Sequence, residues 1–491
     1  MAKSVSVLFV SSEVFPFAKE SGIGDVAYSL SLAIKEQGND IRVMLPKYGC
    51  VSERKNKIHE INRLRDMLVT VGEEEELATV KSSSIHNAKA KVQAYVTTNA
   101  RFFDDMRGIY HDPDTWEEYP DNAERFIFFQ RTVVDTMLTL GWFPDIVHCN
   151  DWQTALIPAY MRLLYPQKFK KTKIVFTIHN FYRQGVFPLS IYKKTELPLE
   201  EINNFKHKNM INFMKSGITY ANYITTVSPT YAKEILNDKV YSGGLNTILK
   251  EKNDKFSGIL NGIDVNLWNP AKDEFIKSRL GSDFDEFKYN NKVALCQKFG
   301  LDFKLGVPLL AMIPRIGYQK GTSLIIDSAD ELFKMDLQFV LLGQGDEDLK
   351  AQLVKVAEKY PDKFKYIFDF DDELSHQIEA GADIFLMPSQ YEPCGLNLMY
   401  SLVYGTVPLV RATGGLKDVA TQYDKKTKTG NAFVFKNYDK SEFVKKVAEA
   451  LDMYQESDHW EQIIENGMAG DYSWKQSASK YLEIYRSILK D

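Results

Sequence analysis

The stretch Pro388–Val419 reads PSQYEPCGLNLMYSLVYGTVPLVRATGGLKDV, and the fold prediction starts from it. It continues an apolar run, ADIFLMPS (382–389), of the kind that forms a buried strand in a parallel sheet. Pro393 stands where a helix would begin, since proline suits the first helical position. Gly405 suits a left-handed C-cap at the end of that helix. The pattern predicts a strand, a short turn and a helix.

A second helix is expected directly downstream. Strand VPLV (407–410) is followed by Thr413, Gly414 and Gly415, which open the next helix. Free N–H groups and dipoles at two neighbouring helix starts would form an anion-binding rim. The carboxylate of Glu392 would be out of place there for phosphate alone. It suits a ligand that also carries hydroxyl groups, such as a sugar nucleotide.

Length and composition narrow the class of protein. A chain of 491 residues predicts two domains or more. A net charge of −5, with basic residues spread out, gives no reason to expect nucleic acid or an anionic membrane surface as a partner. No segment reaches the roughly 18 apolar residues of a membrane span. The N-terminal apolar run has no signal-peptide pattern, and the four cysteines are scattered. We expect a cytoplasmic protein, or one in a plastid-like compartment after processing.

Two series of alternating strands and helices follow one another along the chain, which predicts an α/β protein with doubly wound parallel sheets. We expect domains at 1–255 and 256–472, and a helix at 473–491 that crosses back to the first domain. Ligands of such sheets bind at the carboxyl ends of the strands, here in a cleft between the halves. Helices are expected at 22–37, 122–140, 152–164 and 208–220, and a solvated loop or hairpin edge near GEEEEL (72–77).

The first strand–helix junction, FPFAKESGIGDVAYSL, carries a possible anion site. Gly22 and Gly24 would allow close approach of a ligand to the backbone, and Lys19 adds a positive charge. A simple turn, with Asp25 complementing the helix dipole, explains the same residues. The GxGxxG pattern is incomplete and no ribose-binding acid follows the second strand, which argues against a nicotinamide dehydrogenase.

Polar residues also end two later strands of the first half. His148 and Asp151 lie in HCNDW, and His179 with Asn180 ends KIVFTIHN. These clusters favour a site wall, although a histidine at a strand end is often structural. A metal site would need a third ligand, which the spacing does not supply. The Asp-x-Asp pairs are explained by loops or by a helix cap, so we expect no metal.

The second half supplies two cations just past its first strand. Arg315 and Lys320, in PRIGYQKG, would suit a diphosphate leaving group, and ordinary surface cations are the alternative. There is no Gly-x-Ser-x-Gly elbow, and Cys394 has no evident histidine base. Its place at a helix start would lower its pKa, so it could react with thiol reagents.

Taken in order, these segments resemble one family along essentially the whole chain. Segments similar to those of glycogen and starch synthases are LPKYG, YPDNAERF, DIVHCNDWQTAL, FTIHN, GILNGIDVNLWNP, PRIGYQKG, VLLGQGD and YGTVPLVRATGGLKD. The resemblance implies a retaining glycosyltransferase of the GT-B fold, with two Rossmann-like domains facing across a deep cleft. It implies transfer of glucose from ADP-glucose, or UDP-glucose, to an α-1,4-glucan. It also implies no cofactor, since the nucleotide-glucose is a substrate, and a possible homo-oligomer.

The resemblance assigns roles residue by residue. As catalytic residues it implies Asp151, His179, Arg315, Lys320 and Glu392. As donor-binding residues it implies Arg315, Lys320 and Glu392 with Lys19, Cys394, Gly395 and Leu396. The glycine-led helix starts add Gly22, Thr413, Gly414 and Gly415 as expected donor-binding residues. On the acceptor side we expect Asp25, Asp151 and Asn180.

The chain also departs from the family pattern. Glu20 and Ser21 stand where relatives have Thr-Gly, Pro314 replaces a hydroxyl residue, and Asn397 replaces Thr or Ser. The loop before Leu245 is short. These changes leave open a glucan-binding or priming partner with weak or no transfer activity. Another hexosyltransferase of the same fold, such as a sucrose-forming one, is a further alternative.

Overall fold

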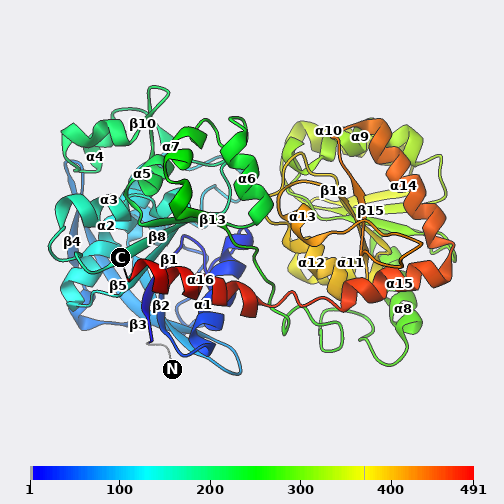
Figure 1. Cartoon of the computed structure of the whole chain (residues 1–491), viewed down its shortest axis with the longest axis horizontal. Helices are drawn as coiled ribbons and strands as arrows, with labels where there is room; N and C mark the ends of the chain where they lie inside the picture. The colour runs from blue at the N-terminus through cyan, green and yellow to red at the C-terminus, as the bar shows by residue number, and fades with distance from the viewer. Residues whose placement is uncertain (1–3, 370, 491) are drawn as a thin grey trace. The chain divides into compact units, whose positions relative to one another are not determined.

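The computed structural model describes residues 4–369 and 371–490 and divides the chain into two compact units (Figure 1). The first comprises the described parts of Met1–Val227, Ala232–Asn261 and Trp474–Asp491, and the second comprises Ser228–Tyr231 and Gly262–Ser473. No helix among the described residues combines the length and the apolar character that crossing a membrane requires.

The first unit is built on a ten-stranded sheet in the order β13-β12-β8-β7-β1-β2-β6-β5-β3, with β4 paired to β5. Pairing is parallel from β13 to β6, and antiparallel among β6, β5, β4 and β3. The strands are β1 (Ser6–Val10), β2 (Asp40–Pro46), β3 (His59–Glu60), β4 (Met67–Val71), β5 (Glu74–His86), β6 (Lys91–Thr98), β7 (Ile146–Asn150), β8 (Lys173–Ile178), β12 (Tyr223–Thr226) and β13 (Phe256–Gly258). A separate small sheet holds β9 (Val186–Phe187), β10 (Lys206–His207) and β11 (Met210–Asn212).

The helices of this unit follow the strands as expected for a parallel sheet. They are α1 (Gly22–Glu36), α2 (Asn122–Leu140), α3 (Ile157–Ala159), α4 (Ile191–Lys194), α5 (Phe213–Tyr220), α7 (Asn246–Glu251) and α16 (Trp474–Ile488); α6 (Pro229–Asn237) runs across the division between the units. Short 3-10 or π turns are η1 (Asn62–Leu64), η2 (Ala100–Asp104), η3 (Trp152–Thr154), η4 (Tyr160–Leu164), η5 (Leu199–Asn204) and η6 (Asn253–Lys255). Gly141, with φ of 63°, ends α2 in the left-handed conformation that glycine adopts without strain.

Three of the expected helices differ in the structure. The segment 152–164 is not one helix, because it is divided into η3, α3 and η4. The helix expected at 208–220 begins only at Phe213, because the preceding residues pair as the β10–β11 hairpin. In the second unit, the helix expected at Pro393 begins at Leu396, after a glycine with positive φ. The GEEEEL charge run belongs to a hairpin, with β4 and β5 on either side of Gly72.

The C-terminal helix α16 belongs to the first unit. It lies along α1, where Ser479 Oγ donates to Gln37 Oε1 at 3.2 Å (Figure 1). On its inner face, the Tyr485 hydroxyl lies 2.6 Å from His148 Nδ1 on β7. Both Tyr485 and His148 are fully buried, so α16 covers part of the sheet.

The second unit contains a six-stranded, wholly parallel sheet in the order β16-β15-β14-β17-β18-β19. Its strands are β14 (Leu309–Met312), β15 (Gln338–Leu342), β16 (Phe364–Ile367), β17 (Ile384–Met387), β18 (Val407–Arg411) and β19 (Phe433–Phe435). Its helices are α8 (Phe284–Phe299), α9 (Thr322–Leu332), α10 (Glu347–Lys359), α11 (Asp372–Gly381), α12 (Leu396–Val403), α13 (Gly414–Val419), α14 (Lys440–Tyr454) and α15 (Ser457–Met468), with the 3-10 turn η7 (Tyr318–Lys320).

Apolar side chains cover both faces of this second sheet. Along β14, Leu310 and Met312 belong to one core cluster, while Leu309 and Ala311 belong to another. Because alternate residues of a strand point to opposite faces, the sheet is buried on both sides. This arrangement leaves the strand ends as the places where polar groups can gather.

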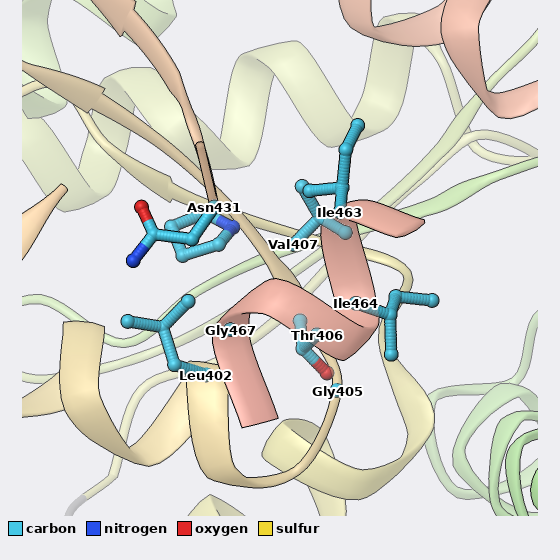
Figure 2. Close-up of a pocket in the computed structure, with 9 residues that line it drawn as sticks. Leu402, Gly405, Thr406, Val407, Asn431, Ile463, Ile464 and Gly467 are labelled. Atoms are coloured by element: carbon cyan, nitrogen blue, oxygen red, sulfur yellow. The ribbon is translucent and has the colours of Figure 1, made fainter. Parts of the chain in front are cut away.

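A small hollow lies where α12, β18 and α15 meet (Figure 2). Figure 2 shows the aliphatic side chains of Leu402, Val407, Ile463 and Ile464 around it. No charged side chain lines it, so this hollow is a gap in apolar packing.

Candidate active site

In the second unit, residues that end β14 and β17 come together. The two strands are neighbours in the parallel sheet, so their carboxyl ends lie at the same edge. Lys320 lies in η7, beyond β14, and Glu392 follows β17. Lys320 Nζ is 2.8 and 2.6 Å from the two carboxylate oxygens of Glu392. Two residues that were predicted separately thus form one ion pair.

Glu392 is held in place as well as paired. Its side chain is buried, and its Oε2 also accepts a hydrogen bond from Ser389 Oγ at 3.1 Å. The Lys320 side chain stays 29% exposed, so the pair opens toward solvent on the lysine side. A buried carboxylate beside a partly exposed cation presents acceptors for hydroxyl groups next to a positive charge suited to phosphate.

The loops before α12 and α13 pack tightly against each other. Gly415 N donates to the carbonyl of Glu392 at 3.1 Å. A Cβ on Gly414, whose φ is +44°, would lie 1.8 Å from that same carbonyl oxygen. Glycine is therefore required where the two backbones meet. The predicted pair of helix starts exists, with Thr413 as the N-cap of α13.

The first of these helices starts later than the sequence indicated. Pro393 lies in the loop, and Gly395, with φ of 79°, is the N-cap of α12. The amides of the segment 394–396 therefore lead into the helix at Leu396. Cys394 is buried, which limits its access to thiol reagents.

Two arginines lie near this edge of the sheet. Arg315 follows β14 and its side chain is exposed. Arg411, at the end of β18, was not predicted, and its Nε donates to the carbonyl of Ser389 at 2.7 Å. Arg411 therefore supports the loop that carries Glu392. The sequence indication for Arg411 was its position at the end of a predicted strand.

In the first unit, Asp151 and His179 end the neighbouring strands β7 and β8. Asp151 Oδ1 accepts a hydrogen bond from the backbone N–H of His179 at 2.7 Å. The backbone of Asp151 has a φ of 54°, which is unfavourable for a non-glycine residue and typical of functional positions. Burial raises the pKa of Asp151 to about 7, although hydrogen bonds from the backbone of His179 and Asn180 oppose the rise.

His179 is neutral near pH 7. Burial lowers its pKa to about 3. Its Nε2 lies 2.9 Å from Asn150 Oδ1, and Asn150 Nδ2 donates to the carbonyl of Val10. Because that bond fixes the amide orientation, Nε2 carries the proton and Nδ1 is the acceptor.

His148 does not belong to this strand-end group, contrary to the expectation of a shared site wall. It is fully buried between Tyr485 Oη and Thr177 Oγ1, both at 2.6 Å. Burial lowers its pKa to about 3, with the nearby His179 adding to the effect. It lies within β7, facing α16, so its role is structural.

A buried carboxylate that the sequence analysis missed organises the loop before α1. Glu13 Oε2 accepts from the backbone N–H groups of Glu20 and Ser21, both at 2.7 Å, and Oε1 accepts from Ser21 Oγ at 2.9 Å and Tyr110 Oη at 2.8 Å. Burial raises the pKa of Glu13, and the charge of Glu20 adds to the rise. The sequence indication for Glu13 was its position, three residues beyond the end of a predicted apolar strand.

Glu20 and Ser21, two of the residues that depart from the family pattern, have definite partners. Ser21 is the N-cap of α1, where its side chain accepts from Ile23 N. Glu20 Oε1 lies 3.3 Å from His111 Nδ1. Burial alone would lower the pKa of His111, but its contacts with Glu118 and Glu20 raise it above the ordinary value. Both side chains are therefore part of the contacts that hold this loop.

Lys19 and Asp25, predicted on opposite sides of the site, form an ion pair at 3.2 Å. Both are partly buried, with side chains 19% and 20% exposed. Gly22 is the first residue of α1. Asn180 Oδ1 accepts from the backbone of Tyr182 at 2.9 Å. Within the described residues, no three His, Cys, Asp or Glu side chains gather in a way that could hold a metal ion.

Comparison with known proteins places this geometry in a family. Residues 6–251 match the model of the starch synthase catalytic domain, and residues 297–468 match that of group 1 glycosyl transferases. Glycogen synthases from Chlorobaculum parvum and Thermotoga maritima are 37% and 40% identical, each covering 99% of both chains. The catalytic domain of starch synthase IV from Arabidopsis thaliana, bound to ADP and acarbose, superposes with a TM-score of 0.90 at 30% identity over 100% of both chains.

Together with these matches, the two units, each built on a largely parallel sheet, identify a glycosyltransferase of the GT-B fold. The matches extend over the whole chain and include both units. The chain belongs to the glycogen and starch synthase family, whose members are glucosyltransferases that elongate glucans.

Proposed function

We propose that this chain transfers glucose from ADP-glucose to the non-reducing end of an α-1,4-glucan, with retention of configuration and without a metal or cofactor. The observation that carries the proposal is the Lys320–Glu392 ion pair beside the two helix starts. The similar starch synthase IV structure, bound to ADP and acarbose, supports an adenine nucleotide as the leaving group.

In this proposal, Lys320 and Arg315 meet the charge that develops on the diphosphate as the glycosidic bond breaks. The amides of Cys394, Gly395 and Leu396, with those of the loop 413–415, add fixed dipoles. Such preorganised groups are often the largest catalytic contribution, and loss of one donor typically costs about 3 kcal/mol. Glu392 binds hydroxyl groups of the donor sugar.

The first unit contributes Asp151 and His179. The neutral imidazole of His179 adds no positive charge that would repel an oxocarbenium-like sugar. The negative charge of an ionised Asp151 would stabilise such a sugar. Since the pKa of Asp151 is about 7, the ionised fraction grows as the pH rises through neutrality. We assign Lys19 and Gly22 to the donor, and Asp25 and Asn180 to the acceptor side.

A glucan-binding partner without transfer activity was motivated by Glu20 and Ser21. Both residues fit the loop, since Ser21 adds a hydrogen bond to Glu13 and Glu20 pairs with His111. The Lys19–Asp25 and Lys320–Glu392 pairs are intact. These contacts favour an active enzyme.

The deciding experiment compares ADP-, UDP- and GDP-glucose as donors on glycogen, with release of the nucleoside diphosphate as the readout. We expect the greatest kcat/KM with ADP-glucose. A clear preference for UDP-glucose would overturn the donor assignment alone. Glycogen binding with no release from any donor would refute catalysis, and transfer to fructose would favour the sucrose-forming alternative.

A further inference from the structure

The aromatic side chain of Tyr182 lies exposed three residues beyond His179. The residue is 73% exposed, compared with 51% for Tyr289 on α8. Isolated exposed apolar groups are common on protein surfaces and carry no meaning by themselves. Tyr182 differs because it lies on the turn that follows β8, near the two strand ends that carry Asp151 and His179.

The backbone on both sides of Tyr182 is held firmly. On one side, Asp151 accepts from His179 N, and Asn180 Oδ1 accepts from Tyr182 N at 2.9 Å. The next residue before the tyrosine, Phe181, is 2% exposed and so anchors the turn in the core. These contacts fix the backbone of the turn at the position from which the Tyr182 side chain projects.

The other side of the turn is anchored by Gln184. Its Oε1 accepts from Asn212 Nδ2 at 2.7 Å, and its Nε2 donates to the carbonyl of Ser242 at 3.0 Å. Gly185 follows with its backbone against the ring of Trp152, where a Cβ would lie 2.7 Å from the indole. An outward-facing aromatic ring on a fixed turn is a preorganised binding surface, because little conformational freedom is lost when a ligand covers it.

We propose that the Tyr182 ring is a platform for an acceptor glucose unit, and that it sets the affinity for the glucan chain. A pyranose ring has apolar C–H faces and a polar rim, so a tyrosine face packs against it while its hydroxyl remains hydrated. The polar Asn180 and Arg183 flank the ring in sequence and suit sugar hydroxyls. The assignment to the acceptor rests on the proposed function, in which the phosphate-binding groups belong mainly to the second unit.

The test uses the full-length protein and maltoheptaose. Kinetics are measured with varied acceptor and with varied donor, and the Kd of maltoheptaose is measured by calorimetry without donor. We expect Tyr182→Ala to raise the acceptor KM and the Kd by about 3- to 10-fold, the range typical of a lost aromatic contact. The donor KM should stay unchanged. Tyr182→Phe should behave like the unsubstituted protein, since the ring is retained.

Tyr289→Ala is the matched control, because it removes an exposed tyrosine from the second unit. It should leave both acceptor constants unchanged. Unaltered KM and Kd in Tyr182→Ala would overturn the proposal, and so would a Tyr182→Phe variant as impaired as Tyr182→Ala. If the unsubstituted protein does not use ADP-glucose, the donor assignment fails, while the calorimetric Kd values still decide the role of Tyr182.

Discussion

Replacing Asp151 with asparagine should make the protein more stable and less active at the same time. Burial raises the pKa of this carboxyl from 3.8 to about 7. At about 1.4 kcal/mol per pH unit, that difference corresponds to about 4 kcal/mol of stability lost when Asp151 is ionised. An amide oxygen can still accept the hydrogen bond from His179 N, so Asp151→Asn removes the charge and keeps the contact.

The sign of the pH dependence follows from proton binding. Between pH 4 and pH 7 the unfolded chain has lost the Asp151 proton while the folded chain retains it. The free energy of unfolding of the unsubstituted protein therefore falls as the pH rises through this range, and this contribution is constant above it. Relative to that protein, Asp151→Asn should be nearly neutral at about pH 4 and more stable by up to about 4 kcal/mol above pH 7.

Urea unfolding at several pH values, together with turnover from ADP-glucose to glycogen, measures both effects. We expect kcat to fall by about 100-fold or more, since a charge that supports the transition state is lost. If Asp151→Asn is less stable than the unsubstituted protein at pH 8, the ionised Asp151 does not destabilise the fold. The same conclusion follows if the gain in the free energy of unfolding does not vary with pH. Near-normal turnover would remove Asp151 from the catalytic residues.

Asp135→Asn provides a matched control for this variant. Asp135 lies on α2, and burial raises its pKa to about 6. Its substitution should give a smaller gain of stability with the same sign, because the rise of the pKa is smaller. Turnover should not change, since Asp135 is not part of the candidate site.

Four further substitutions test the ion pair of the second unit and the loop before α1. Glu392→Ala and Lys320→Ala should each lower turnover by orders of magnitude while the circular dichroism spectrum is retained, because the ion pair is preorganised for the donor. Ser21→Gly should lower the free energy of unfolding by about 1 kcal/mol in urea, since it removes a cap and a hydrogen bond to a buried carboxylate. Glu20→Gln should destabilise the protein mainly below about pH 6.5, because the pair with a protonated His111 is lost as the pH rises through its raised pKa.

Each of these expectations has an opposing result. Normal turnover in either variant of the ion pair would reject that residue as part of the site. A Ser21→Gly protein as stable as the unsubstituted one would show that the hydroxyl contributes nothing to the loop. Equal destabilisation by Glu20→Gln at acid and alkaline pH would rule out a role for the charge of His111.

The sequence predicted regular elements well where the periodicity was continuous. The helix expected at 122–140 is α2 with the same bounds, because its apolar positions repeat without interruption up to Gly141. Predictions failed where the local backbone is irregular. Pro393 suggested a helix start, but the positive φ of Gly395 delays α12 until Leu396. The sequence also predicted helix from Lys208, where the structure has the β10–β11 hairpin. The positive φ of Lys208 and Asn209, which forms the turn of this hairpin, is not visible in the sequence pattern.

Site residues at strand ends could be predicted because parallel sheets bring such ends to one edge. The contacts among these residues could not be predicted from the sequence. The spacing placed Lys320 and Glu392 in separate motifs, and only the fold shows that the two form an ion pair. Glu13 was not predicted because its hydrogen bonds from the backbone of Glu20 and Ser21 depend on the conformation of the loop between β1 and α1. His148 was misjudged since its partner, Tyr485, is 337 residues away.

That last contact has a consequence for the order of events during synthesis. The ribosome makes the strand that holds His148 early, and it makes α16, which covers that strand, only after the whole second unit. Until the residues of α16 emerge, an imidazole and its apolar neighbours on β7 remain uncovered. The first unit thus cannot reach its final state before the whole second unit has been translated. A ribosome stalled before residue 474 would carry a nascent chain with that face of the sheet open to chaperones and proteases.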